Sequence, residues 1–267
     1  MTDRLVALGD SFSCGEGVGL QFTLDQTWVG LLSSSLGLEM DIVAAPGETA
    51  GELRQHQLAV ALERSSALAT LLVGLNDTIR LDYDAVATRA NIAAVVTELC
   101  AAYPVVLVGR WHDPLSMFTL PSAARTMMAN RIGTVNLAID EAIAANDRAV
   151  CLDLGSLDAL RHRWAWAVDR IHPSLSGHRV IAAAAAHALR GHFPWQAPVP
   201  MCVPDEKITA FAETRWAVRH GAPWLAQRLR KAVLPAAANV VARNDRAAVG
   251  EPGPGGDVPR AQQLANR

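Results

Sequence analysis

The sequence has few cysteines, little net charge and no long apolar run, and each shortage argues against a class of protein. The four cysteines, at positions 14, 100, 151 and 202, are widely spaced and form no Cys-x-x-Cys pair. Neither a zinc site nor a disulfide framework is therefore indicated, and reduced, buried thiols are expected. The formal net charge of -2 over 267 residues does not suggest a nucleic-acid binder, so the expected partner is a small molecule.

Membrane and secretion signals are also missing from the pattern. The apolar stretch 180–189 is rich in alanine and is interrupted by His187, and it falls well short of the roughly 20 residues that span a bilayer. The first residues run directly into a short apolar segment, which leaves no room for a secretion signal. We therefore expect no membrane span and a cytoplasmic location. No histidine and carboxylate cluster has metal-ligand spacing, so we expect no metal and no cofactor.

Short apolar runs alternate with amphipathic segments over most of the chain. The expected strands are 5–8, 38–45, 67–73, 105–109 and 149–154, and the expected helices are 28–36, 49–63, 84–101, 122–145 and 176–190. This alternation predicts an α/β fold, with a five-stranded parallel sheet that helices cover on both faces. Ligands of such sheets gather at the carboxyl ends of the strands.

The composition changes after residue 193 and predicts three regions. Residues 1–193 form the main domain, 194–243 a Pro-rich crossing followed by a helical extension, and 244–267 a disordered tail rich in Gly, Pro, Ala and Gln. The second helical pattern is basic, and the basic residues of the extension are Arg215, Arg219, Arg228, Arg230 and Lys231. A solvated face that covers the main domain is favoured there over contact with an anionic surface.

Ser11 is the candidate nucleophile. It follows the first apolar run in Gly9-Asp10-Ser11, where the neighbouring glycines free the backbone for a tight turn. Alone this is weak evidence, because many parallel sheets carry a glycine-rich turn after their first strand. Cys14 is a second candidate nucleophile, although packing of the loop is favoured for it.

A serine hydroxyl needs a base to accept its proton and a third group that holds the base in the correct tautomer. His172 is the best candidate base, since it lies in a loop just ahead of a helix. Asp169, three residues earlier, can accept the Nδ1 proton of His172 while Nε2 faces Ser11. Among the other histidines the only serious rival is His112, in the loop 111–121.

Acyl transfer also needs hydrogen-bond donors that stabilise the developing oxyanion. The backbone amide of Gly47 and the side-chain amide of Asn76 both lie at expected strand ends and can join the amide of Ser11 in a three-point site. Each alone has an ordinary explanation, because Pro-Gly usually forms a turn and Asn-Asp often caps a helix. Their joint occurrence is what favours catalysis.

These segments resemble, in order, the four blocks of the SGNH/GDSL hydrolase family: Gly9-Asp10-Ser11, Gly47, Gly74-Leu75-Asn76-Asp77 and Asp169-Arg170-Ile171-His172. The resemblance covers about residues 4–190. It implies a three-layer α/β/α flavodoxin-like fold and ester hydrolysis through an acyl-serine intermediate. It also implies a triad of Ser11, Asp169 and His172 and an oxyanion hole of Ser11, Gly47 and Asn76. The C-terminal appendage resembles the extension of intracellular bacterial members that have no assigned substrate, in Trp216, His220, Pro223, Trp224 and Arg228-Leu229-Arg230.

Two positions depart from the common patterns. Phe12 replaces the leucine of Gly-Asp-Ser-Leu and leaves the nucleophile intact. Ser13 stands where a nucleophile elbow would carry glycine, which argues against the ordinary α/β-hydrolase fold. Phe12 and the bulky loop 111–121 either line an apolar pocket for the substrate or pack in the core, and the sequence does not separate these alternatives.

The primary hypothesis is a serine esterase that cleaves a small-molecule carboxylic ester, with a short acyl group such as acetyl. A thioesterase or an acyltransferase would use the same triad, since both share the acyl-enzyme and differ in the bond cleaved or the acceptor. A non-catalytic binding protein that acts through its basic C-terminal helices is a third reading. A binding protein would have no physical need for the full set of Ser11, Gly47, Asn76, Asp169 and His172, which argues against this alternative. These residues do not specify an oligomeric state.

Overall fold

A computed structural model describes residues 3–15, 23–194, 196–199, 215 and 219. The chain divides into two units, residues 1–217 and 218–267, and the description below concerns the first. Apart from Arg215 and Arg219, the expected helical extension and tail lie outside the described residues. The prediction of a basic C-terminal face therefore stays a prediction.

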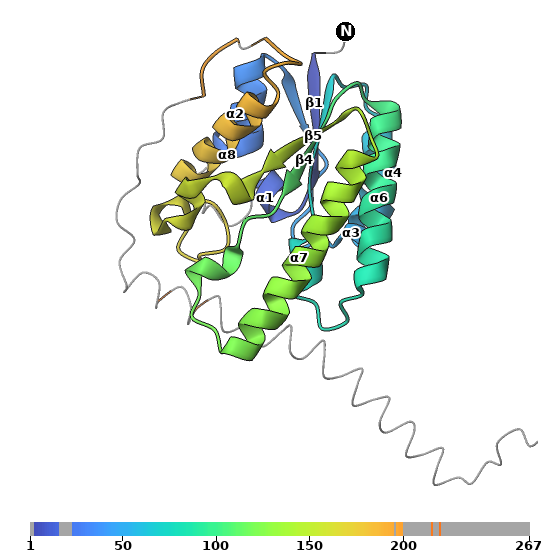
Figure 1. The fold of residues 1–267 in the computed structure, drawn as a ribbon. Helices are drawn as coiled ribbons and strands as arrows, with labels where there is room; N and C mark the ends of the chain where they lie inside the picture. The colour runs from blue at the N-terminus through green and yellow to red at the C-terminus, as the bar shows by residue number, and fades with distance from the viewer. Residues whose placement is uncertain (1–2, 16–22, 195, 200–214, 216–218, 220–267) are drawn as a thin grey trace, which may run out of the picture. The chain divides into compact units, whose positions relative to one another are not determined.

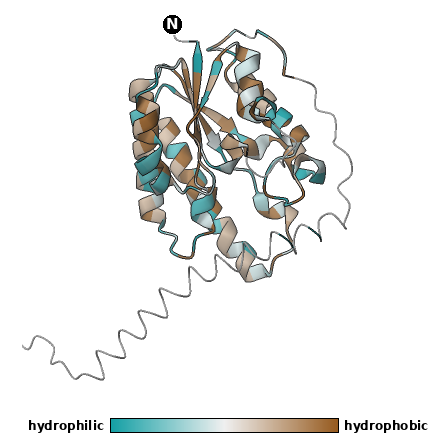
Figure 2. Cartoon of the chain, turned by 180° about the vertical axis from the view of Figure 1, so that it is seen from behind, coloured by the Kyte–Doolittle hydropathy of each residue, from teal (hydrophilic) through white to brown (hydrophobic). Residues whose placement is uncertain are grey.

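A five-stranded parallel sheet forms the centre of this unit (Figure 1). Its order is β2-β1-β3-β4-β5. All five positions of β3 are buried and all but Thr70 are apolar, as expected for a strand that is covered on both faces of the sheet. The apolar colouring of the central strands in Figure 2 follows from this burial. The strands are β1 Arg4–Gly9, β2 Glu39–Ile42, β3 Leu68–Leu72, β4 Val106–Arg110 and β5 Ala149–Asp153.

The strand order reverses at β1, which pairs with β2 on one side and β3 on the other. In open parallel sheets the ligand crevice lies at such a reversal, beyond the carboxyl ends of the strands. Gly9 ends β1 opposite Leu72, with φ 143°. A Cβ at Gly9 would lie 2.5 Å from the Leu72 carbonyl oxygen, so only glycine fits where the chain leaves the sheet.

Helices cover both faces of the sheet (Figure 1). Helices α2 and α8 pack together on one face, while α3, α4, α6 and α7 lie on the other. The longer helices begin and end where the sequence supplies caps: the Thr27 hydroxyl accepts from Gly30 N at the start of α2, and left-handed Gly37 ends it. The helices are α1 Ser11–Cys14, α2 Trp28–Leu36, α3 Ala50–His56, α4 Leu58–Leu62, α5 Leu75–Thr78, α6 Ala85–Ala102, α7 Ser122–Ala144 and α8 Leu175–Ala188. Short 3₁₀ turns occupy Leu24–Gln26, Pro114–Met117, Leu154–Ser156, Asp158–Arg161 and Arg163–Ala165.

Helix α6 is long and apolar enough to cross a membrane by length and composition alone. In this fold it instead packs against α7 and α3. One side of it is buried, through residues such as Ile92, Val96 and Leu99. The contacts with α7 and α3 account for the apolar residues of this buried side.

Two details differ from the sequence-based expectation. Segment 49–63 is not one helix, because α3 ends at His56 and α4 begins at Leu58. Gln57, between them, turns its side chain to the backbone of Gly9. Helix α8 begins at Leu175 after its cap Ser174, whereas the expected helix began at Ser176, which lies buried in the first turn.

Replacement of Ser174 by alanine should lower the free energy of unfolding by about 1 kcal/mol or more. The Ser174 hydroxyl accepts from Gly177 N at 3.1 Å and donates to the Trp164 carbonyl at 2.7 Å, and the residue is buried. Ser156→Ala is the matched control, because its exposed hydroxyl also donates to a carbonyl, that of Asp153, but caps no helix. Urea unfolding measures both variants. Equal losses would contradict the capping role.

Candidate active site

Ser11 is the first residue of a short helical turn, α1, directly beyond the end of β1. Asp10 caps this turn: its Oδ1 accepts a hydrogen bond from the Phe12 amide at 3.0 Å. Gly15 ends the turn in the left-handed conformation, with φ 78°. Ser11 is half-buried between fully buried Asp10 and Phe12. The turn therefore fixes the serine at the edge of the sheet between two anchored neighbours.

Asp169 holds His172 through both its backbone and its ring. Asp169 Oδ1 accepts the amides of Ile171 and His172, at 2.9 and 3.0 Å. Asp169 Oδ2 lies 2.6 Å from His172 Nδ1. Arg170 between them has φ 61°, a left-handed conformation that is uncommon for a residue with a side chain and that makes this loop tight enough for the contacts. The contact expected between Asp169 and His172 is present.

The loop of His172 meets the turn of Ser11. The ring centroids of Phe12 and His172 are 6.1 Å apart, and His172 acts electrostatically on buried Asp10. Phe12, which follows Ser11, is thus a neighbour of His172. Segments at the two ends of the main domain lie together at the carboxyl edge of the sheet, as the sequence predicted.

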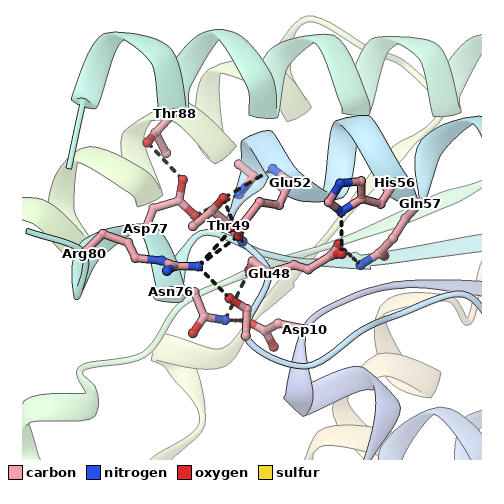
Figure 3. A network of polar contacts seen from close by, with 12 residues as sticks. Asp10, Glu48, Thr49, Glu52, His56, Gln57, Asn76, Asp77, Arg80 and Thr88 are labelled. Atoms are coloured by element: carbon pink, nitrogen blue, oxygen red, sulfur yellow. Dashed lines mark hydrogen bonds and ion pairs between the residues drawn. The ribbon is translucent and has the colours of Figure 1, made fainter. Parts of the chain in front are cut away.

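Asn76 brings the other two segments to the same place (Figure 3). Its Nδ2 donates to Asp10 Oδ2 at 2.9 Å and to the Glu48 carbonyl at 3.2 Å. The amide group is thereby linked to the neighbour of Ser11 and to the neighbour of Gly47. Both of its N–H groups have an acceptor, so donation to an oxyanion would have to share one of them.

Asp10 is the most electrostatically perturbed carboxyl group of the site. Complete burial raises its pKa to about 7, against the hydrogen bonds from Phe12 and Asn76 and the charge of His172, which lower it. Asp77, also buried nearby, raises the pKa of Asp10 further. A buried carboxyl group that accepts from two donors is best matched by its ionised form, while burial favours the neutral form.

A wider polar network lies behind the site, and sequence reasoning missed it (Figure 3). Gln57 pairs with the backbone of Gly9 in both directions, at 3.0 and 2.8 Å, and donates to Glu48 Oε2 at 2.6 Å. His56 contacts the other oxygen of Glu48 at 2.9 Å. The signal in the sequence was Gln57 itself, a polar residue within the expected helix 49–63. The structure shows that its side chain is buried.

The aromatic residues near Ser11 belong to the core. Phe12 and Trp111 are 2 % and 1 % exposed, and their rings meet edge to face with centroids 5.1 Å apart. The ring centroids of Trp166 and Phe12 are 6.2 Å apart. Of the two alternatives left open for Phe12 and the start of loop 111–121, the structure favours packing in the core.

The rival residues are placed less well for catalysis. His112 stacks on Trp166 with centroids 4.7 Å apart, and burial lowers its pKa to about 4. Within the described residues neither ring nitrogen of His112 has a hydrogen-bond partner, so no carboxylate orients it. His178 is a structural link, because its Nδ1 accepts from the Trp28 amide at 3.1 Å and so connects α8 to α2.

Cys14 Sγ lies 3.9 Å from the Ser11 carbonyl oxygen, a contact that fits packing of the turn. Among the described residues, no group of three histidine, cysteine or carboxylate side chains could hold a metal ion.

Comparison with known proteins identifies relatives of this arrangement. The GDSL-like lipase/acylhydrolase family matches residues 7–180. No curated protein matches the chain.

Solved structures share the fold. The psychrotrophic esterase EstA from Pseudoalteromonas is 15 % identical, with a TM-score of 0.56 over 71 % of this chain and 97 % of its own. TesA is 20 % identical, with a TM-score of 0.56 over 70 % and 98 %. A mutant of Axe2, an acetyl-xylooligosaccharide esterase from Geobacillus, is 19 % identical, with a TM-score of 0.53 over 73 % and 98 %.

Asp10→Asn should remove a pH dependence of stability. The Asp10 carboxyl keeps its proton up to about pH 7 in the folded chain, but an unperturbed aspartate loses it near 3.8. Between these values unfolding releases a proton, so this group makes the free energy of unfolding fall as pH rises, by at most about 1.4 kcal/mol per pH unit. The difference in stability, wild type minus variant, should therefore decrease between about pH 4.5 and about pH 7.5. Urea unfolding across that range measures it, and parallel curves would contradict the raised pKa.

Proposed function

The chain belongs to the GDSL-like lipase/acylhydrolase family, and on that premise we propose that it is an SGNH-type esterase, which cleaves a carboxylic ester through an acyl-serine intermediate. The observation that carries this proposal is the 2.6 Å contact of Asp169 Oδ2 with His172 Nδ1, beside Phe12, the residue that follows Ser11. A carboxylate at Nδ1 keeps the proton on that nitrogen and leaves Nε2 as the basic atom.

In the first half of the reaction Ser11 Oγ attacks the ester carbonyl carbon while His172 Nε2 takes the hydroxyl proton. The carbonyl oxygen becomes an oxyanion, which the amides of Ser11 and Gly47 and the side chain of Asn76 stabilise. The bond to the alcohol oxygen then breaks, the alcohol leaves with the proton from His172, and the acyl group remains on Ser11. Asp169 stabilises the imidazolium that forms in between.

In the second half a water molecule gives a proton to His172 Nε2 and attacks the acyl-serine. Collapse of the second oxyanion releases the carboxylic acid, and Ser11 recovers its proton from His172. Asn76 would share its longer hydrogen bond, the 3.2 Å contact with the Glu48 carbonyl, with each oxyanion. Its 2.9 Å bond to Asp10 would keep the amide in place.

A short acyl group fits best. Phe12 and Trp111, the bulky candidates for an apolar acyl wall, are buried in the core and offer little surface to a long chain. One solved structure of the same fold is named as an acetyl-xylooligosaccharide esterase, which agrees with an acetyl group.

The test is release of p-nitrophenol from acetyl, butyryl and octanoyl esters, with chelator present, by wild type, Ser11→Ala and Ser13→Ala. Loss of the serine nucleophile typically lowers kcat by about 10⁶-fold, so Ser11→Ala should be inactive. Ser13→Ala, which changes a buried serine two residues away, should keep its activity. The rate should fall from acetyl to octanoyl.

Labelling and acceptor competition complete this experiment. A fluorophosphonate should label wild type and not Ser11→Ala. Absence of both turnover and labelling in wild type would overturn the serine-hydrolase proposal. Product analysis with added alcohols or thiols separates hydrolysis from acyl transfer, and an acyl-CoA substrate tests the thioesterase alternative.

A further inference from the structure

The proposed oxyanion donor Gly47 lies in the segment between β2 and α3. The side chains around Gly47 in this segment do little to fix its backbone. Gly47 has φ 77°, and no atom lies within 4 Å of the place where its Cβ would be. Pro46 before it is exposed. A glycine in open space loses more conformational freedom on ordering than any other residue, so something else must fix the direction of its N–H.

Residues just beyond β3 provide that anchorage (Figure 3). The Glu48 carbonyl accepts from Asn76, and the Ala50 amide donates to Asp77 Oδ2 at 2.9 Å. The Gly47 carbonyl accepts from Arg80 Nη2 at 3.3 Å. The backbone of the loop 47–50 is thus held at three of its four positions by side chains from one short segment.

Arg80 is itself held at one guanidinium nitrogen and at its backbone carbonyl. The same Nη2 lies 3.0 and 3.2 Å from the two carboxylate oxygens of Glu52. Arg131 donates to the carbonyl of Arg80 at 2.8 Å and so fixes its backbone. Arg131 therefore holds the backbone of Arg80 and Glu52 holds its guanidinium group, and together they place Nη2 at the Gly47 carbonyl.

Glu52 is fixed in turn by the start of α3. It forms a capping box with Thr49, whose amide donates to Glu52 Oε2 at 2.9 Å. Burial raises the pKa of Glu52, but hydrogen bonds from Thr49 and the charge of Arg80 outweigh it and lower the pKa overall. Glu52 thus stays ionised, and the Arg80 contact is a charge-assisted one.

We propose that Arg80, paired with Glu52, is a positioning residue of the oxyanion site, which holds the Gly47 carbonyl so that the Gly47 N–H points at the reacting carbonyl oxygen. The inference rests on the proposed function. The Gly47 carbonyl lies in the Gly47–Glu48 peptide plane and the Gly47 N–H in the preceding one, so holding the carbonyl limits the φ and ψ pairs through which the N–H can turn away. Arg80 touches no reacting atom in this account, so its removal should change the alignment of a donor rather than the binding of substrate.

The first experiment measures kcat and KM of Arg80→Ala and Arg80→Lys on p-nitrophenyl acetate. Complete loss of one oxyanion donor costs about 10²- to 10³-fold in kcat, and a misaligned donor should cost part of that, about tenfold. KM should stay within about twofold, because the loss falls on the transition state. Arg80→Lys should recover part of the rate, since lysine keeps the charge without the planar fork.

Arg89→Ala is the matched control. Arg89 also pairs with a glutamate, Glu141, at 2.7 Å, but it lies on α6 and contacts α7 rather than the loop 47–50. Its loss should leave kcat unchanged. Thermal unfolding of both variants shows whether the kcat of Arg80→Ala follows general destabilisation. If Arg80→Ala does not fold, Arg80→Lys and Glu52→Gln carry the same test, because Gln preserves the capping oxygen but removes the ion pair.

Chemical rescue separates positioning from a merely structural role. A cavity of about 230 Å³, lined by residues that include Thr49, Glu52 and Arg80, opens beside the arginine and gives small ions a route to its place. Ethylguanidinium should restore kcat of Arg80→Ala several-fold and should not change Arg89→Ala or revive Ser11→Ala.

Three results for Arg80→Ala would overturn the inference. The first is a kcat equal to that of wild type, and the second is a raised KM at constant kcat. The third is a lack of rescue by ethylguanidinium together with an unfolding temperature that falls in proportion to the activity. All three presuppose an active wild type. An inactive, unlabelled wild type would instead refute the proposed function itself.

Discussion

The hydrogen bond between Asn76 Nδ2 and Asp10 Oδ2 is the contact on which the site depends. Its 2.9 Å length joins the end of β3 to the end of β1, the two strands between which the sheet order makes a crevice. From Asp10 the connection continues to the Ser11 turn, and from Asn76 to the Glu48 carbonyl and so to Gly47. Ser11, the proposed nucleophile, and the proposed oxyanion donors are therefore joined by one set of hydrogen bonds, and catalysis by preorganised dipoles requires such a connection.

This arrangement has an energetic cost that the surrounding core offsets. Asp10 is buried with a raised pKa, Asp77 is buried near it, and Arg170 is held in a left-handed conformation. Each feature is unfavourable alone, and such features persist where the rest of the structure over-determines the local conformation. Here the over-determination comes from the fully buried strand β3 and from Gln57, which pairs with Gly9 in both directions.

The sequence predicted much of this arrangement, because the strongest signals were periodic or local. Alternating apolar runs gave the parallel sheet, and Asp169 with His172, three residues apart, predicted a contact that local backbone geometry alone can make. The expected start of a helix at residue 49 agrees with α3, whose cap is Thr49. The break at Gln57, the Ser174 cap and the Arg80 contact could not be read, since each depends on a partner far along the chain or on the choice between neighbouring serines. The burial of Phe12 against Trp111 and Trp166 likewise depends on tertiary packing.

The placement of His172 near the end of the main domain has a consequence for biosynthesis. Ser11 lies in the first turn of the chain, and its proposed base lies just ahead of α8. Helix α8 packs on α2, where His178 Nδ1 accepts a hydrogen bond from the Trp28 amide. A nascent chain can complete all five strands and the proposed oxyanion donors while it still lacks the proposed base. On the proposed mechanism, a chain that ends before His172 has no base for Ser11, so activity requires synthesis of the segment that leads into α8.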